Sequence, residues 1–351
     1  MTQSGQKIRI KFSARTAYDQ DPSLWTCLFT GRVPEIGNCV FTFDPDDENY
    51  DWFVVYEDLI PLTGEKRGNR IESLACHKDN TLFITTEPTS IKHYGPNYLR
   101  QFGHVMSVQP HKIIKHPNQI FQTPPLRWYY GRPLGDDETD FTSIDEFRAQ
   151  ENVSEIERVS TVCSTKTMTP TLAQRFEFTK TLKALLGEEL EWFGRGVRPI
   201  KNKAEAMDNF RYHIAIENHI EDHHWTEKIA DCYLSFSLPF YYGPKNISDY
   251  FPEDSYIEID IFDVHKSAEI IKIALAEKSY TDRLPAILEA RTRVLERYNL
   301  MQTIAECVQA HHKKLPVTSL KTICGRHAFR RKHPMLHLSD IVRETLYKKA
   351  S

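Results

Sequence analysis

The stretch Tyr212–Tyr242, which reads YHIAIENHIEDHHWTEKIADCYLSFSLPFYY, decides the fold of this chain. It begins with an apolar strand, Tyr212–Ile216, and continues into a polar loop. Thr226 then caps a helix with one apolar face, and Leu238–Tyr242 forms the next strand. Strand, helix and strand following one another at this spacing predict a parallel sheet with helices on both faces.

The same alternation extends on both sides of this stretch. Thr169-Pro170 opens a helix that ends at Gly187, because proline suits the first turn of a helix and glycine its end. Residues 132–158 lose the hydrophobic periodicity and are rich in acids, which favours a linker. Further strands are predicted at Ile8–Phe12, Cys39–Phe43, Trp52–Tyr56, Thr81–Thr85, His104–Val108, Val159–Cys163, Leu190–Phe193 and Tyr256–Phe262.

The length of the chain predicts more than one domain. With 351 residues, it exceeds what one hydrophobic core usually serves. We predict an N-terminal α/β domain over residues 1–150, a second α/β domain over 151–305 and a basic helical tail over 306–351.

Composition excludes several classes of protein. Hydrophobic residues make up 40% and charged residues 26%, as in ordinary globular proteins. Apolar runs stop at about five residues, whereas a membrane-spanning helix needs ~20. The polar start Met1–Lys7 lacks the apolar block of a signal peptide. Seven scattered cysteines without a CxxC pair favour reduced thiols, and we expect a cytoplasmic protein.

The charge is distributed unevenly along the chain. The net charge is −3, yet residues 291–351 hold 13 lysines and arginines against 4 acids. Two interpretations fit this tail. It can lie against anionic lipid, as a peripheral contact at the inner face of a membrane, or it can be a solvated helical face that balances an acidic body. We expect no nucleic-acid partner.

The edge after Tyr212–Ile216 is the best candidate for a ligand site. Ligands of such sheets bind where strands end and the next helices begin. Lys228 lies in the first turn of the predicted helix, where the helix dipole disfavours a cation, so a neighbouring anion such as a diphosphate would suit it.

These residues resemble family-ten glycosyltransferases, the α-1,3-fucosyltransferases. The resemblance lies in a strand ending in Glu217-Asn218, a loop, Thr226-Glu227-Lys228, a helix, and Leu238-Pro239-Phe240-Tyr241-Tyr242-Gly243. It is strongest over residues 170–262 and extends more weakly to Phe83-Ile84-Thr85-Thr86-Glu87-Pro88. The resemblance implies a GT-B fold, in which two Rossmann-like domains, an N-terminal acceptor domain and a C-terminal donor domain, face a cleft.

The resemblance also implies roles for single residues at the donor. Arg175 and Lys228 would contact the diphosphate of GDP-fucose, Glu227 the ribose hydroxyls and Asn218 a polar group of the donor. His224 stands where relatives commonly have a tyrosine, so we include it among the donor-binding residues. Arginine and lysine suit phosphate oxygens, and a carboxylate accepts hydrogen bonds from two vicinal hydroxyls.

The implied reaction is an inverting transfer of fucose to a hydroxyl of an oligosaccharide or a lipid-linked glycan. Glu87 would act as the base, and positioned cations would stabilise the leaving diphosphate, so we expect no metal and no cofactor. The acidic triplets Asp46-Asp47-Glu48 and Asp136-Asp137-Glu138 favour solvated turns.

Three alternatives remain open. The donor can be another nucleotide sugar. His219 and His223, four residues apart, can bind zinc in a metal-dependent hydrolase if they share a helix face. The chain can also be a silent carbohydrate-binding protein, although Glu87, Arg175, Glu227 and Lys228 occurring together argue against this.

Overall fold

The computed structural model describes residues 6–15, 22–65, 68–123, 125–134, 140–152, 154–317 and 321–350. The chain divides into two compact units. Unit 1 contains residues 1–125 and 300–351, and unit 2 contains residues 126–299.

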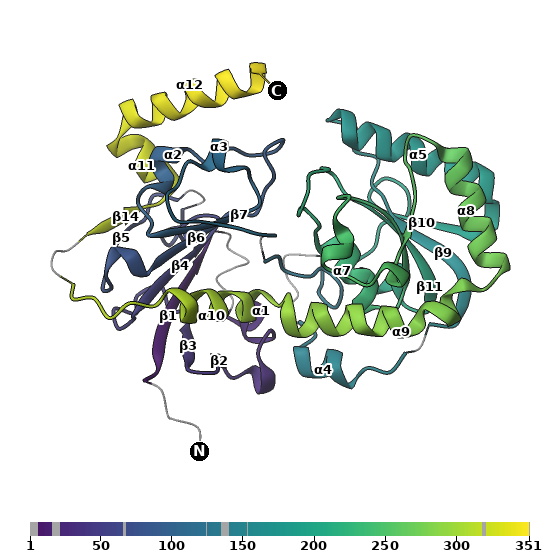
Figure 1. Cartoon of the computed structure of the whole chain (residues 1–351), viewed down its shortest axis with the longest axis horizontal. Helices are drawn as coiled ribbons and strands as arrows, with labels where there is room; N and C mark the ends of the chain where they lie inside the picture. The colour runs from purple at the N-terminus through teal and green to yellow at the C-terminus, as the bar shows by residue number, and fades with distance from the viewer. Residues whose placement is uncertain are drawn as a thin grey trace. The chain divides into compact units, whose positions relative to one another are not determined.

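Unit 1 is built on a seven-stranded sheet in the order β2-β3-β1-β4-β6-β7-β8 (Figure 1). All neighbouring pairs in this sheet are parallel except β2 with β3. The central strands are apolar on both faces, as expected for a covered parallel sheet. The strands are β1 (Ile8–Ala14), β2 (Glu35–Ile36), β3 (Cys39–Thr42), β4 (Trp52–Tyr56), β6 (Thr81–Ile84), β7 (His104–Ser107) and β8 (Gln119–Phe121).

The helices of unit 1 are short before residue 125 and longer in the C-terminal part. The first three helices have four residues each: α1 (Ser23–Thr26), α2 (Pro96–Leu99) and α3 (His111–Ile114). They are followed by α10 (Leu300–His311), α11 (Arg326–Lys332) and α12 (Pro334–Ala350). Short 3-10 turns lie at η2 (Thr30–Arg32) and η3 (Lys78–Asn80).

The C-terminal tail is part of unit 1. Its strand β14 (Thr322–Cys324) pairs antiparallel with β5 (Ile71–Ser73), and Phe329 of α11 joins the core cluster that includes Phe83. We predicted a separate tail beginning at residue 306. The structure instead returns the chain to unit 1 at residue 300, because the tail completes that unit's core.

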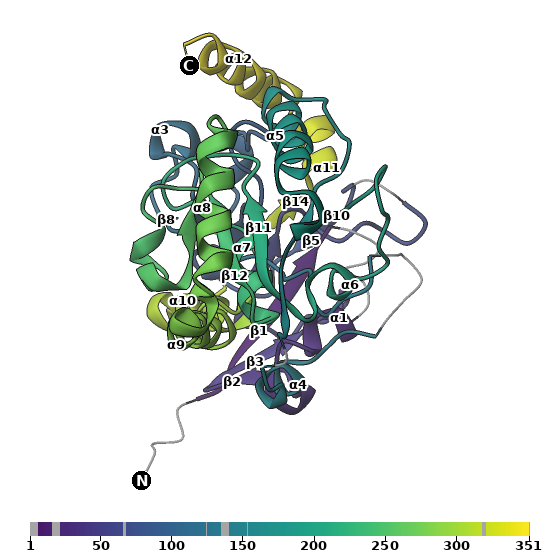
Figure 2. The same ribbon diagram turned by 90° about the vertical axis from the view of Figure 1, so that its right-hand side faces the viewer.

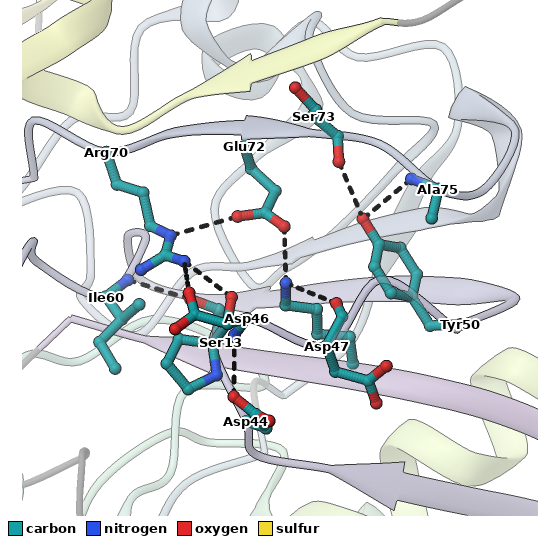
Figure 3. Close-up of polar contacts among 12 residues, drawn as sticks. Ser13, Asp44, Asp46, Asp47, Tyr50, Ile60, Arg70, Glu72, Ser73 and Ala75 are labelled. Carbon is teal, nitrogen blue, oxygen red and sulfur yellow. Dashed lines mark hydrogen bonds and ion pairs between the residues drawn. The ribbon is translucent and has the colours of Figure 1, made fainter.

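A buried ion pair fastens β5 to the main sheet. Lys11 of β1 is 2% exposed, and its Nζ lies 2.6 Å from Oε1 of Glu72 on β5. Arg70 Nε lies 3.2 Å from the other oxygen of Glu72, and the Tyr50 hydroxyl donates to the Ser73 carbonyl at 3.3 Å (Figure 3). Removing one partner from such a buried pair is costly. These contacts therefore fix the strand that holds the tail.

Unit 2 has a parallel five-stranded sheet in the order β10-β9-β11-β12-β13. The predicted Tyr212–Ile216 strand is confirmed within β11, and the predicted strand at Tyr256–Phe262 shrinks to two residues. The strands are β9 (Ile156–Val162), β10 (Leu190–Phe193), β11 (Phe210–Ile216), β12 (Leu238–Tyr242) and β13 (Ile257–Glu258).

Helices cover both faces of this sheet. Helices α5 and α8 run side by side on one face, and α7 lies on the other (Figures 1 and 2). Thr169 caps α5 and Gly187 ends it with a φ of 56°, as predicted. The helices are α4 (Ile144–Ala149), α5 (Pro170–Leu186), α6 (Ala204–Met207), α7 (Glu227–Leu234), α8 (Val264–Ala276) and α9 (Ser279–Thr292). Shorter turns lie at η4 (Gly187–Glu189), η5 (Ile247–Asp249) and η6 (Glu253–Ser255), and a π-turn at η7 (Arg293–Arg297).

The region predicted as a linker belongs largely to unit 2. Within it, α4 begins with a capping box between Ser143 and Glu146. Arg148 pairs with Glu296 at 2.7 Å, and Arg291 donates to the Phe147 carbonyl. The boundary therefore lies at residue 125, earlier than the predicted 150. Two α/β units with largely parallel sheets nevertheless confirm the prediction of two Rossmann-like domains of the GT-B type; the cleft stays a prediction.

Candidate functional site

The end of β11 is fastened to the start of α7 by a buried carboxylate. Glu217 is fully buried, and its carboxylate accepts hydrogen bonds from the Thr226 backbone N–H at 2.8 Å and the Thr226 hydroxyl at 2.7 Å. The Tyr241 hydroxyl of β12 donates to the same carboxylate at 3.2 Å. Thr226 in turn caps α7 by accepting from the Lys228 backbone N–H. The carboxyl edge of the sheet and the helix start thus form one rigid element.

Lys228 lies at the centre of this element. Its Nζ is 2.9 Å from the Thr226 hydroxyl, 3.2 Å from Glu227 Oε1 and 3.3 Å from Glu217 Oε2. Burial disfavours the ammonium, yet the Glu227 and Glu217 carboxylates outweigh burial and raise the pKa of Lys228. The cation predicted in the first turn of α7 is present, charged and oriented by its neighbours.

Glu227 remains ionised in this setting. Burial raises its pKa, but the ammonium groups of Lys228 and Lys203 have the larger combined effect and lower the pKa to about 2. The side chain is 17% exposed, so the carboxylate can reach a ligand. A charged carboxylate accepts hydrogen bonds only, which suits hydroxyl groups.

Arg175 and Asn218 meet at the same edge of unit 2. Arg175 projects from α5, and its Nη1 donates to Oδ1 of Asn218, which follows β11. Arg175 Nε is buried without a hydrogen-bond partner in the described part of the chain. The charge of Arg175 also acts on the pKa of Lys228 and lowers it. The structure therefore brings together four of the predicted donor residues, Arg175, Asn218, Glu227 and Lys228.

His224 is placed deeper than a typical ligand-binding side chain. It is 3% exposed, and burial lowers its pKa to about 4, so the imidazole is neutral near pH 7. Its Nδ1 has no hydrogen-bond partner among the described residues, and its ring lies edge-on to His219 at 5.4 Å. His224 therefore provides a buried neutral ring within the loop of residues 217–226, and not a cation that could bind a phosphate.

A second ion pair beneath the site escaped the sequence reasoning. Lys203 Nζ lies 2.5 Å from Oδ2 of Asp231, which is fully buried on α7. The other oxygen of Asp231 accepts from the Tyr129 backbone N–H at 3.0 Å. Burial disfavours the Lys203 cation, but the Asp231 and Glu227 carboxylates outweigh burial and raise the pKa of Lys203. The hint in the sequence was an aspartate on the apolar face of a helix, which demands a partner.

The predicted base, Glu87, belongs to unit 1. It is half-buried and follows β6, and its backbone carbonyl accepts from Gln109 Nε2 at 2.8 Å. Nearby on the same loop, Lys92 pairs with Glu57 at 2.6 Å. Glu87 therefore lies at the carboxyl edge of the sheet of unit 1, while the residues predicted to bind the donor lie in unit 2.

The histidine pair expected for the alternative hydrolase does not share a helix face. Residues 217–226 form a loop, in which His223 has a φ of 68°. His219 contacts Glu221 at 3.1 Å, whereas His223 Nδ1 lies 2.7 Å from the Tyr250 hydroxyl. Among the described residues, no group of three or more metal-binding side chains is suited to hold an ion. The triplet Asp136-Asp137-Glu138 lies outside those residues.

Comparisons with known proteins find similarity to fucosyltransferases over most of unit 2. Residues 155–282 match the family described as glycosyltransferase family 10 (fucosyltransferase), C-terminal part. An α-(1,3)-fucosyltransferase, FucT, of Helicobacter pylori is 29% identical over 87 residues, which cover 24% of this chain and 18% of that relative. The predicted resemblance to family-ten glycosyltransferases is thereby confirmed for this region.

Solved structures of α1,3-fucosyltransferases are also similar. One is 16% identical with a TM-score of 0.47, covering 81% of this chain and 82% of that chain. Another, with GDP-fucose, is 14% identical with a TM-score of 0.44, covering 85% and 93%.

Proposed function

We propose that the chain is an inverting glycosyltransferase that moves fucose from GDP-fucose to a hydroxyl group of a glycan acceptor, as α-1,3-fucosyltransferases do. The observation that carries this proposal is the meeting of Arg175, Asn218, Glu227 and Lys228 at one sheet edge within the family match. Two cations and a carboxylate there suit a diphosphate joined to a ribose.

Each donor residue has a task that its chemistry supports. Arg175 and Lys228 bind the diphosphate and stabilise the negative charge that builds on it as the bond to fucose breaks. Glu227 accepts hydrogen bonds from the ribose hydroxyls, and Asn218 orients Arg175 through its amide oxygen. With two cations at the leaving group, the reaction requires no metal or cofactor in this proposal.

Glu87 acts as the general base in unit 1. It takes the proton from the attacking hydroxyl while the oxygen attacks the anomeric carbon from the face opposite the diphosphate, so the configuration inverts. The acceptor is an oligosaccharide or a lipid-linked glycan. A different nucleotide sugar is the second candidate for the donor.

The basic tail supports a further part of the proposal, a peripheral contact with anionic membrane. Helix α11 ends in Arg330, Arg331 and Lys332, and all three side chains are exposed. No helix in the described part of the chain is long and apolar enough to cross a bilayer. The cytoplasmic placement stays a prediction.

A panel of nucleotide sugars tests the donor. Ligands that bind the native state raise its thermal stability by mass action, so GDP and GDP-fucose should raise the melting temperature more than UDP-sugars do. GDP release with a set of glycan acceptors then measures turnover. Stabilisation by a UDP-sugar alone would mean that the donor is a nucleotide sugar other than GDP-fucose. Hydrolysis that depends on added zinc would contradict transfer from either donor.

A further inference from the structure

One buried side chain of unit 1 holds both ends of the segment that begins with Glu87 and ends with Lys92. Gln109 is fully buried, and its Nε2 donates to the Glu87 carbonyl at 2.8 Å and to the Lys92 carbonyl at 2.9 Å. Gln109 follows β7, which pairs with β6, and its own carbonyl accepts from Gln119 Nε2 at 2.7 Å. The segment 87–92, which lies in the loop after β6, is therefore anchored to the sheet through Gln109.

The amide of Gln109 leaves one polar atom without a partner. Within the described part of the chain, its Oε1 is buried and accepts no hydrogen bond. A buried acceptor without a partner is costly. Turning the amide over would place Oε1 against the carbonyl oxygens of Glu87 and Lys92, so these two carbonyls determine how the amide is oriented.

A residue with a strained backbone holds the side chain of Lys92. Glu57 follows β4 and has a φ of 71°, in the left-handed region that residues with a side chain rarely adopt. Its backbone N–H donates to the Ile84 carbonyl of β6 at 3.0 Å. Oε1 of its carboxylate lies 2.6 Å from Lys92 Nζ and 3.2 Å from Arg15 Nη1. Such strain persists where the surrounding contacts over-determine the backbone, and it is common at functional sites.

A third contact holds the start of the same loop. The Thr86 backbone N–H donates to the Tyr94 hydroxyl at 3.2 Å, and the Tyr94 ring is 1% exposed and lies 4.9 Å from Lys92 Nζ. Gln109, Glu57 and Tyr94 thus anchor this loop from three sides. Loops are usually more mobile than the elements that they connect, so three anchors on one short loop point to a side chain whose direction matters.

We propose that Gln109 and Glu57 are positioning residues that act through Glu87. They hold the two ends of the segment 87–92 and thereby fix the direction of the Glu87 side chain; the inference rests on the proposed function, in which Glu87 is the general base. A base has to lie within hydrogen-bond reach of the proton that it takes, and a misplacement of about 1 Å can cost about 10²-fold in rate. Both residues belong to unit 1, whereas the proposed donor residues belong to unit 2.

A double-mutant cycle on the full chain tests this inference, with turnover measured as GDP release from GDP-fucose in the presence of a glycan acceptor. Gln109→Met removes both amide donors at a similar length and should lower kcat about 10- to 100-fold, while the Kd for GDP stays unchanged. In the Glu87→Gln background, the same substitution should change kcat by less than about twofold. A positioning residue has no further effect once the group that it positions is gone.

Gln101→Met is the matched control. Gln101 Nε2 also donates to two backbone carbonyls of unit 1, those of Tyr98 at 3.1 Å and Cys324 at 3.4 Å, but it holds the tail and not the segment 87–92. Its replacement removes the same chemistry, and kcat should stay within about twofold of the unaltered chain.

Glu57→Gly keeps the test valid if Gln109→Met does not fold. Glycine adopts a positive φ without strain, so this variant should fold, yet it lacks the carboxylate that holds Lys92. We expect a lower kcat in this variant too, and no further loss when it is combined with Glu87→Gln.

The possible outcomes separate this inference from the function on which it rests. Normal turnover of Glu87→Gln would show that Glu87 is not the base, and the proposed mechanism would fail together with the inference. If Glu87→Gln loses turnover, the inference alone is overturned by normal turnover of Gln109→Met and Glu57→Gly. It is likewise overturned by losses that multiply with that of Glu87→Gln, or by an equal loss in Gln101→Met.

Discussion

Replacing Arg175 by alanine tests the donor site most directly. Among the described residues, Arg175 is the cation of the site whose side chain pairs with no carboxylate, and the hydrogen bond that its guanidinium donates goes to Asn218. A diphosphate can therefore use its charge without displacing another anion. A hydrogen bond to a charged group contributes about 1.5–3 kcal/mol. Since 1.4 kcal/mol corresponds to a factor of ten, Arg175→Ala should raise the Kd for GDP by about 10- to 150-fold.

The same substitution should leave the fold nearly unchanged. Asn218, which loses its hydrogen bond with Arg175 in this variant, is exposed and can hydrogen-bond to water instead. Substitutions of this kind usually change the free energy of unfolding by about 0.5 kcal/mol or less. A loss of GDP affinity therefore reports on the site and not on global stability.

Lys180→Ala provides a matched control on the same helix. Lys180 carries the same charge on α5, its side chain is 63% exposed, and it lies 3.8 Å from Glu177. Isothermal titration calorimetry with GDP at one ionic strength compares the two variants. If Arg175→Ala binds GDP within twofold of the unaltered chain, or if Lys180→Ala loses as much affinity, Arg175 does not bind the diphosphate.

Three other outcomes are expected. Glu87→Gln should lower turnover by about 10²–10⁴-fold and leave the Kd for GDP-fucose unchanged, because it cannot accept a proton. Burial lowers the pKa of His224 from 6.5 to about 4, so the neutral imidazole contributes fully to stability above pH 6.5, and this contribution is lost as the pH falls towards 4. In His224→Phe, the free energy of unfolding should therefore depend less on pH between 6.5 and 4. Lys203→Met leaves the Asp231 carboxylate buried without its cation and should cost about 3–5 kcal/mol in urea unfolding, whereas the double variant Lys203→Met/Asp231→Asn should lose much less.

Each of these outcomes has a contrary result. Near-normal turnover of Glu87→Gln would remove this residue from the mechanism. An unchanged pH profile in His224→Phe would mean that the imidazole is not buried in its neutral form. Additive losses in the Lys203 and Asp231 variants would mean that the two side chains do not interact.

The alternating pattern of unit 2 could be predicted because local signals and tertiary packing agree there. Thr169, Pro170 and Gly187 bound α5 as expected, since caps depend on neighbouring residues only. The pairing of β5 with β14 could not be predicted, because it joins residues about 250 positions apart in short strands that carry no clear periodicity. The placement of the tail in unit 1 follows from that pairing.

The positions of the proposed donor residues could be predicted because these residues lie beside recognisable boundaries of helices and strands. Glu227 and Lys228 begin a helix, and Asn218 follows a strand, so the sequence alone places them at one sheet edge. Lys203 could not be found in this way. Its role depends on the short segment before α6 approaching Asp231 of α7, a contact that only the folded structure specifies.

The contacts of Lys228 connect the role proposed for Lys228, binding the diphosphate, with the role proposed for Glu227, binding the ribose. Its N–H groups point towards Thr226, Glu217 and Glu227, so a diphosphate that draws on Lys228 has to replace one of these partners. Glu217 is fully buried and accepts three hydrogen bonds, and moving it would break the hydrogen bonds that connect the end of β11 to the start of α7. Glu227 is the partner that reaches solvent, so it is the one that yields. If the diphosphate binds Lys228 as proposed, it frees the Glu227 carboxylate to accept hydrogen bonds from the ribose hydroxyls, so the two contacts should form together.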